Sequence, residues 1–176
     1  MSHLQHRGAC TERAIQFDGD KVREILAGTL THDRRPVRMP AAASRLAEFH
    51  HLDFLGTAVF TDGTCVRSPF GKVGDRLWVR ETWAALGHKG RPPFVYRADQ
   101  PEGERVRVDA PWRSSVHMPL EACRILLEVT VLRIERQQPA TEEHALSDRA
   151  GETSPWLWVV DFTAKQLNKE LDSGIS

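Results

Sequence analysis

The chain has 176 residues, of which 40% are hydrophobic, enough to bury the core of one domain. Its 24 Lys and Arg residues balance 24 Asp and Glu residues, so nucleic-acid binding would need a local basic patch and not a generally cationic surface. The apolar runs are too short to span a bilayer and the N-terminal residues are polar, which predicts a cytoplasmic protein with no membrane partner. Cys10, Cys65 and Cys123 are far apart and fit free thiols in a reducing compartment.

The N-terminal part of the chain predicts a strand followed by a helix. Residues 1–12 carry no periodic pattern and are expected to be flexible. Residues 14–17 alternate weakly, as a short strand does, and Asp18 can cap a following helix that Gly28 ends. Residues 29–38 predict a loop that leads into a short strand.

The middle of the chain predicts short strands and turns. Residues 41–56 place apolar side chains at helical spacing, and a helix and an irregular insertion both fit this segment. The dipeptide Asp62-Gly63 favours a tight hairpin turn between two strands. Residues 76–83 alternate polar and apolar side chains with period two and form the clearest strand prediction. Residues 94–97 and 105–108 are two further short strand candidates.

The C-terminal part predicts a long strand over residues 123–136, a capped helix over 140–151 and a closing strand over 156–162. Residues 164–176 predict a tail that is a loose helix or disordered. Together the elements indicate one α+β, mostly β domain over residues 13–163. Its expected architecture is a β-barrel of about five or six strands with two or three flanking helices.

Several segments resemble ASCH domains, which belong to the PUA-like superfamily. In the opening motif of that family a helix ends at glycine and is followed by x-Lys-x-x-(Glu or Thr)-x-Arg, and residues 21–36 resemble it with Gly28 and Arg35 at the matching positions. Further segments look like ASCH-like proteins of bacteriophages and prophages, namely residues 74–83, 96–99, 112–119 and 125–130. The resemblance implies a PUA-like β-barrel whose first helix and following loop border a cleft.

The same resemblance implies three alternative functions. The leading one is a binding module for RNA, single-stranded nucleic acid or a modified nucleoside, because members of the family are linked to RNA binding. Other members hydrolyse N4-acylated cytidine or act as ribonucleases, so a hydrolase is the alternative. The third is a phage accessory protein that binds a host protein through residues 41–56. No cofactor is expected, because the sequence has no dinucleotide fingerprint and no phosphate-loop motif.

The candidate catalytic residues depart from the family pattern. Leu30 stands at the lysine position and cannot supply an ammonium group, Asp33 stands at the threonine position, and Asp148 falls at the position of the family's glutamate. Glu81 shares the apolar parity of its strand, so a buried carboxylate there needs either an ion pair with Arg35 or a catalytic role. We therefore expect binding, with little or no turnover of N4-acetylcytidine.

The candidate ligand-binding residues are cationic, aromatic or able to read a base edge. Arginine can bind phosphate bidentately, and aromatic rings can stack on bases. The candidates are Arg34, Arg35, Lys72, Arg80, Trp83, Trp112, Ser115 and His117. Each has a structural alternative: salt bridges for the arginines, core packing for the tryptophans and turn capping for the loop that contains Ser115 and His117. The histidines have no ligand-like spacing, so no metal is expected.

Overall fold

The structure is a computed structural model, and it is mostly β. It describes residues 11–44, 46–90, 92–100, 110–137 and 155–167. These residues form ten strands, one α-helix and four short 3-10 turns, which confirms the α+β, mostly β prediction. None of the described helices is long and apolar enough to cross a membrane.

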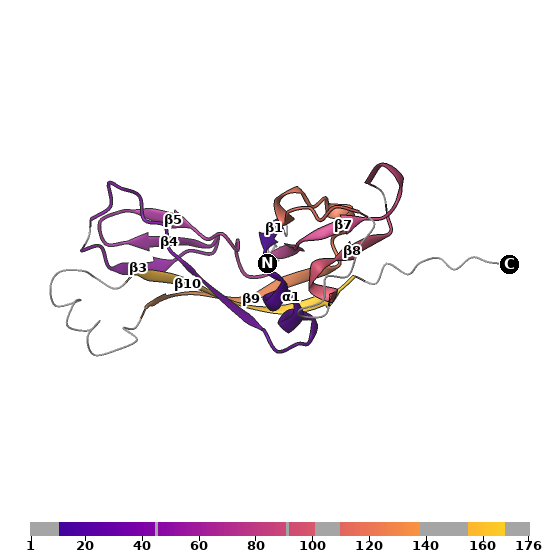
Figure 1. The fold of residues 1–176 in the computed structure, drawn as a ribbon. Helices are drawn as coiled ribbons and strands as arrows, with labels where there is room; N and C mark the ends of the chain where they lie inside the picture. The colour runs from indigo at the N-terminus through magenta and orange to yellow at the C-terminus, as the bar shows by residue number, and fades with distance from the viewer. Residues whose placement is uncertain (1–10, 45, 91, 101–109, 138–154, 168–176) are drawn as a thin grey trace, which may run out of the picture.

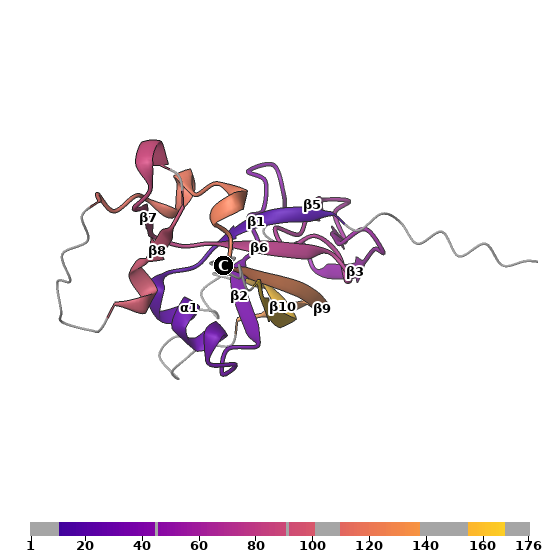
Figure 2. The same ribbon diagram turned by 90° about the vertical axis from the view of Figure 1, so that its right-hand side faces the viewer.

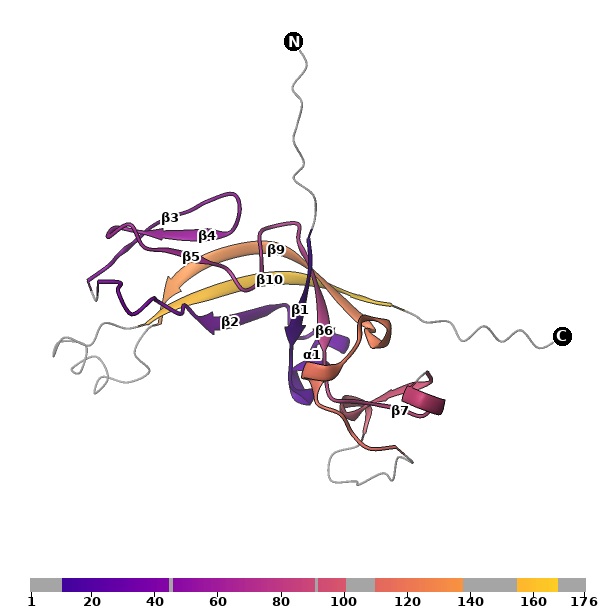
Figure 3. The same cartoon turned by 90° about the horizontal axis from the view of Figure 1, so that it is seen from above.

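Five strands form the main sheet. Their order across the sheet is β1 (Glu12–Gln16), β6 (Arg76–Arg80), β9 (Ile125–Arg136), β10 (Trp156–Gln166) and β2 (His32–Pro36). Strand β1 runs parallel to β6, and the other neighbours are antiparallel. The long strands β9 and β10 lie side by side and connect the two ends of the molecule (Figure 1 and Figure 3).

Two smaller sheets lie at opposite ends of β9 and β10 (Figure 1). One contains β3 (Phe49–Leu52), β4 (Thr57–Phe60) and β5 (Cys65–Arg67). The other pairs β7 (Trp83–Ala85) with β8 (Phe94–Tyr96). The three-stranded sheet packs on the start of β10, where the rings of Phe49 and Phe60 each lie 6.1 Å from the Trp156 ring.

Helix α1 (Gly19–Leu26) connects the edge strands β1 and β2. The Asp18 carboxylate accepts a hydrogen bond from the Lys21 amide at 2.9 Å and caps the helix as predicted. Gly28 has φ +73, a left-handed conformation that lets the chain leave the helix towards β2. The buried side of α1, Val22 and Ile25, packs into the main core beside β10 (Figure 2).

The core lies on one face of the main sheet. In β6 the side chains of Leu77 and Val79 are buried while Arg76 is exposed, which confirms the predicted period-two pattern. Leu127 of β9 and Val160 of β10 are fully buried on the same face. Burial of these alternating apolar side chains is what specifies the register of the sheet.

The main sheet is not a closed barrel within the described residues, because no hydrogen-bonded ladder joins its edge strands β1 and β2. A side chain links them instead. Arg35 on β2 donates through Nη2 to the backbone carbonyl of Gln16 on β1 at 3.0 Å. The expected barrel of five or six strands is therefore replaced by a five-stranded sheet whose edges meet through Arg35.

Residues 41–56 contain a strand, so the helix alternative for this segment was wrong. Strand β3 pairs with β4, and the Asp53 carboxylate accepts hydrogen bonds from the amides of Leu55 and Thr57 in the connecting turn. The exposed fractions of Leu46 and Leu55 are 79% and 44%, so these residues do not form the buried stripe of a helix. Backbone pairing with β4 makes residues 49–52 a strand, although the apolar residues of this segment have the spacing of a helix.

The bounds of other strands also differ from those predicted. The predicted strand over 76–83 is divided between β6 and β7, and β10 continues to Gln166, where the sequence predicted a loose tail. Glu12, assigned to the flexible N-terminus, is the first residue of β1. The predicted strand over 105–108 and helix over 140–151 lie outside the described residues.

The two faces of β9 give a direct test of this core. We expect Leu127→Ala to lower the free energy of unfolding by about 2–5 kcal/mol, because it leaves a cavity at a fully buried position. Leu126→Ala removes the same atoms from the opposite, partly exposed face and should cost clearly less. Urea unfolding measures both, and equal losses would contradict the assigned face.

Candidate functional site

Asp33 is a buried carboxylate that binds two cations of the protein. Its side chain is 3% exposed and lies on the same face of β2 as Arg35. Lys21 Nζ donates to Oδ1 at 2.8 Å, and Arg35 Nε donates to Oδ2 at 3.1 Å. Because each carboxylate oxygen already has a cationic donor, the geometry gives Asp33 a role in positioning these side chains and not in reacting with a ligand.

Arg35 is held rigidly but keeps free donors. Its Nε and Nη2 donate to Asp33 and Gln16, and the rings of Phe17 and Phe70 lie 5.7 and 5.4 Å from the guanidinium carbon. Its Nη1 has no acceptor among the described residues, although that nitrogen carries two N–H groups. With its side chain 34% exposed, Arg35 presents a fixed cationic end to solvent.

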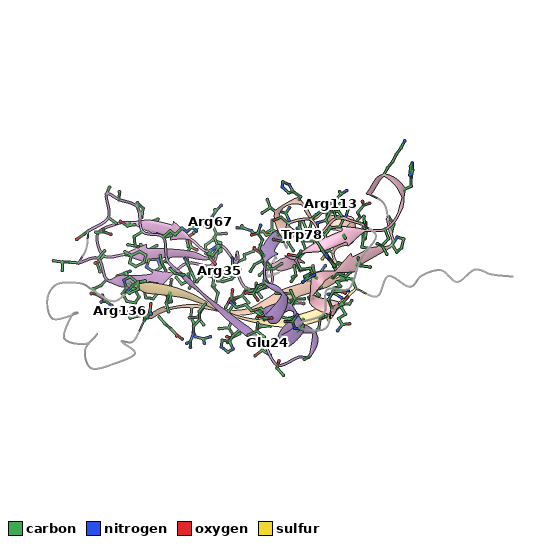
Figure 4. The ribbon with its side chains drawn as sticks, viewed as in Figure 1. Glu24, Arg35, Arg67, Trp78, Arg113 and Arg136 are labelled. Atoms are coloured by element: carbon green, nitrogen blue, oxygen red, sulfur yellow. The ribbon has the colours of Figure 1, made fainter. Side chains whose placement is uncertain are left out.

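A cleft of about 450 Å³ opens beside Arg35. Its lining comes from β2 and the loop after it, from β5 and the loop after it, and from β10. The lining residues are Arg35, Pro36, Arg38, Val66, Arg67, Pro69 and Trp158. Figure 4 shows Arg35 and Arg67 next to each other beside β5. We refer to this site as the arginine cleft.

The arginine cleft has an excess of positive charge. Arg38 and Arg67 are exposed, and among the described residues neither has an ion-pair partner. No carboxylate of the described chain lines the cleft, and Asp33, the partner of Arg35, is shared between Lys21 and Arg35. Guanidinium groups gathered in this way repel one another, and an anion between them would relieve the repulsion.

Arg34 does not lie in this cleft. Neighbouring residues of a strand point to opposite faces, so Arg34 is on the far side of β2 from Arg35. There Arg34 Nη2 lies 3.7 Å from the Glu135 carboxylate, beside a separate pocket of about 620 Å³ that also contacts Arg136 and Leu157. The two arginines that the sequence grouped together therefore belong to different surfaces.

Glu81 is buried as predicted, but the expected partner Arg35 was wrong. Arg124 donates to both carboxylate oxygens of Glu81, from Nε at 2.8 Å and from Nη2 at 2.9 Å. Burial raises the pKa of Glu81 above its ordinary value despite the opposing effect of Arg124. Because Glu81 is 1% exposed and bidentately paired, it stabilises the fold and cannot reach a ligand in the arginine cleft.

Arg124 extends this ion pair into a small network. Its Nη1 donates to Asp99 at 2.8 Å, and its guanidinium lies 3.9 Å from the centre of the Tyr96 ring. Burial raises the pKa of Tyr96 to about 12, and the Tyr96 hydroxyl donates to the carbonyl of Ala122 at 2.7 Å. The network ties the β7–β8 hairpin to the start of β9.

The candidate tryptophans do not line the arginine cleft. Trp83 is 2% exposed and packs edge-on against Phe94 in a second small core, so its ring has no free face for a base. Trp112 is partly exposed, with the Arg97 guanidinium 5.6 Å from its ring centre. Trp83 therefore packs in the core, which was the structural alternative to base stacking.

The remaining candidates also lie outside the arginine cleft. Arg80 stacks on the ring of Trp78 at 4.4 Å and donates to the carbonyl of Val116 at 3.3 Å. That contact binds β6 to the 3-10 turn of Ser115 and His117, which Ser114 caps by accepting a hydrogen bond from the Val116 amide. The Lys72 amide donates to Asp75 in the loop before β6. Asp148 lies outside the described residues.

Sequence reasoning missed Lys21, Arg38, Arg67 and Arg124. Leu30 packs against the main core, yet an ammonium group does reach Asp33, because Lys21 in the first turn of α1 supplies it. The motif position was therefore a poor guide to the charge around Asp33. No periodic pattern in the sequence singles out Arg38 and Arg67. They become neighbours only in the folded protein, where the segments after β2 and around β5 line one cleft. No group of three or more possible metal ligands occurs among the described residues.

The fold and the site together define a mostly β, α+β protein with a cationic cleft between two of its sheets. No protein-family model matches the chain, and no curated protein or solved structure matches it. The geometry of the cleft is therefore the basis for the function proposed below.

The ion pair of Glu81 predicts a pH-dependent effect. Arg124→Met should lower the free energy of unfolding by about 3–5 kcal/mol at pH 7, because it leaves a buried carboxylate without its cation. Arg124 opposes the rise that burial gives the pKa of Glu81, so removing Arg124 raises that pKa further. The loss therefore grows as the pH rises through the raised pKa and shrinks towards pH 5, where more of the carboxyl group is protonated. Equal losses at pH 5 and pH 7, measured by urea unfolding, would count against the assignment. The double variant Glu81→Gln/Arg124→Met should be more stable at pH 7 than Arg124→Met alone.

Asp33 gives a second stability test. Asp33→Asn keeps the shape of the side chain but replaces one of its two acceptor oxygens with an NH₂ group. That NH₂ group then points at the N–H donor of Lys21 or of Arg35, so we expect the free energy of unfolding to fall by about 1–3 kcal/mol. Asp161→Asn is the matched control, because Asp161 is half-exposed and its pair with Arg133 should contribute at most about 1 kcal/mol. If both variants unfold at the same urea concentration, the anchoring role of Asp33 is wrong.

Proposed function

We propose that this chain is a PUA-like, ASCH-type module that binds RNA, single-stranded nucleic acid or a modified nucleoside in the arginine cleft. One observation carries the proposal: three arginines converge on a cleft that no described carboxylate lines. Arginine presents a planar set of N–H donors that matches phosphate oxygens, and contacts to phosphate supply most of the affinity in nucleic-acid binding.

The arrangement of the sheet supports the same proposal. The resemblance to ASCH domains implies a cleft beside the first helix and the loop after it. Here Arg35 follows α1, bridges the edges β1 and β2, and lines the cleft. Arg35 is thus a motif position that also lines the cleft, and this coincidence supports the proposal.

The walls of the cleft suit a nucleotide-sized ligand. Pro36, Val66 and Pro69 supply apolar surface between the arginines, and Trp158 closes the floor. A volume of about 450 Å³ is within the range of small-ligand sites. A base or ribose could pack on these apolar groups while the arginines bind phosphate.

Hydrolysis has less support from the geometry. Asp33 and Glu81 are the described carboxylates among the candidate catalytic residues, and both are buried in ion pairs with protein cations. A general acid or base must reach the reacting group within about 3 Å, directly or through one water. Neither carboxylate lines the arginine cleft, so binding is the function that the described residues favour.

A separate observation favours protein binding as a second candidate function. Phe54, in the turn between β3 and β4, is 85% exposed, and Leu46 is 79% exposed. Large exposed apolar side chains are often found where proteins meet. Both lie in residues 41–56, the segment from which the sequence suggested a contact with a partner. Phe54→Ser should leave nucleic-acid affinity unchanged, because Phe54 does not line the arginine cleft.

The arginine cleft predicts a charge-specific loss of affinity. Replacing both Arg38 and Arg67 with Gln should weaken binding of a short fluorescent single-stranded RNA by about tenfold or more and reduce its salt dependence, since each lost phosphate contact lowers the salt slope by about 0.7. Both side chains are exposed and without ion-pair partners in the described chain, so folding should be unaffected.

Arg34→Gln is the matched control. It removes one positive charge, as Arg38→Gln or Arg67→Gln does singly, from the residue next to Arg35 but on the opposite face of β2, and it is compared with those single variants. Fluorescence anisotropy at 50 and 200 mM salt should show a much smaller change for this variant. Equal weakening by Arg34→Gln would mean that the general charge of the surface, and not the arginine cleft, binds the RNA.

A further inference from the structure

The number of cations at the arginine cleft points to the charge of its ligand. Arg35, Arg38 and Arg67 line the cleft, and no described carboxylate does. Asp33 pairs with Lys21 and Arg35 outside the lining, so these four cations and one carboxylate together carry an excess of three positive charges. A phosphodiester within a strand carries one negative charge. A terminal phosphate monoester carries about −1.5 to −2 at pH 7 and has three strong acceptor oxygens. The monoester is the better match to this charge excess.

The donors are also arranged for a terminal group. Arg35 is fixed by Asp33, Gln16 and two aromatic rings, so the position of its free Nη1 is set before a ligand binds. Arg38 and Arg67 reach the same cleft from the loop after β2 and from β5. Donors from three segments of the chain can contact different oxygens of one phosphate, whereas a phosphodiester has only two unbridged oxygens to offer.

The size of the cleft favours one nucleotide. A site of about 450 Å³ with Trp158 as its floor has room for a single nucleotide-sized group on its apolar walls. The terminal nucleotide of a strand fits a site of this size.

We propose that the arginine cleft recognises a terminal phosphate monoester, carried either by the end of a nucleic-acid strand or by a free mononucleotide. This inference rests on the proposed function and narrows it, because it excludes nucleosides without phosphate. Arg35 provides the contact fixed by the fold, and the exposed Arg38 and Arg67 provide the other two.

The test compares RNAs that differ only at one end. Anisotropy with a short 3′-fluorescent RNA should give about tenfold or higher affinity for the 5′-phosphorylated form than for the 5′-hydroxyl form, the gain expected of a charge-assisted contact. A 5′-labelled RNA with and without a 3′ phosphate shows which strand end is preferred. Cytidine monophosphate, cytidine and inorganic phosphate are used as competitors. If the monophosphate competes as well as the phosphorylated RNA, a free mononucleotide is the ligand, and weaker competition assigns the strand end.

Variants place the recognition in the cleft. In Arg38→Gln/Arg67→Gln the preference for the phosphorylated end should fall below about threefold, because two of three guanidinium donors are gone. Arg76→Gln, which removes an equally charged side chain paired with Glu12 on the outer face of β6, should retain the preference. A preference that survives in the double variant would overturn the assignment to this cleft.

The outcomes separate this inference from the function on which it rests. RNA binding that depends on Arg38 and Arg67 but is indifferent to phosphate at either end would overturn the terminal-phosphate inference and leave the proposed function in place. Absence of binding by every RNA, nucleotide and nucleoside probe would overturn both.

Discussion

The carboxylate of Asp33 joins helix α1 to strand β2 and fixes Arg35, which lines the cleft. It is buried on β2, where it binds Lys21 from α1 and Arg35 from its own strand, and Arg35 in turn donates to the Gln16 carbonyl on β1. Asp33 and Arg35 together thus connect the helix to both edges of the main sheet. Taking a carboxylate out of water is costly unless its oxygens are paired, and here two cations pair them. The same contacts fix Arg35 in place while leaving part of its guanidinium free.

The two buried carboxylates of this protein have different consequences. Glu81 meets Arg124 bidentately, and Arg124 is also bound by Asp99 and stacked on Tyr96, so its guanidinium is fully committed to the fold. Asp33 instead shares its charge between two cations and leaves an excess of positive charge at the surface. The first arrangement uses every guanidinium nitrogen of Arg124 within the fold, and the second leaves Nη1 of Arg35 without an acceptor among the described residues. The geometry of the partners, and not burial alone, distinguishes the two carboxylates.

Local sequence signals predicted the elements near which the site forms. The period-two pattern over residues 76–83 and the apolar alternation over 123–136 correspond to β6 and β9, and Asp18 and Gly28 bound the helix as expected. These predictions succeeded because they depend on side-chain alternation and backbone conformation within a few residues. The helix considered for residues 41–56 failed because pairing with β4 outweighs a spacing of apolar residues that fits a helix.

The sequence by itself determined the mostly β character and the burial of Glu81, since the alternation of side chains along an extended segment is a local property. Only the tertiary structure decided which charges meet. In the folded protein Arg34 and Arg35 lie on opposite faces of β2, and Glu81 pairs with Arg124. Lys21 pairs with Asp33, and Arg38 and Arg67 line the same cleft. Ion pairs and clefts of this kind join residues far apart in the chain, and electrostatic attraction acts through distance in space, which no local pattern in the sequence encodes.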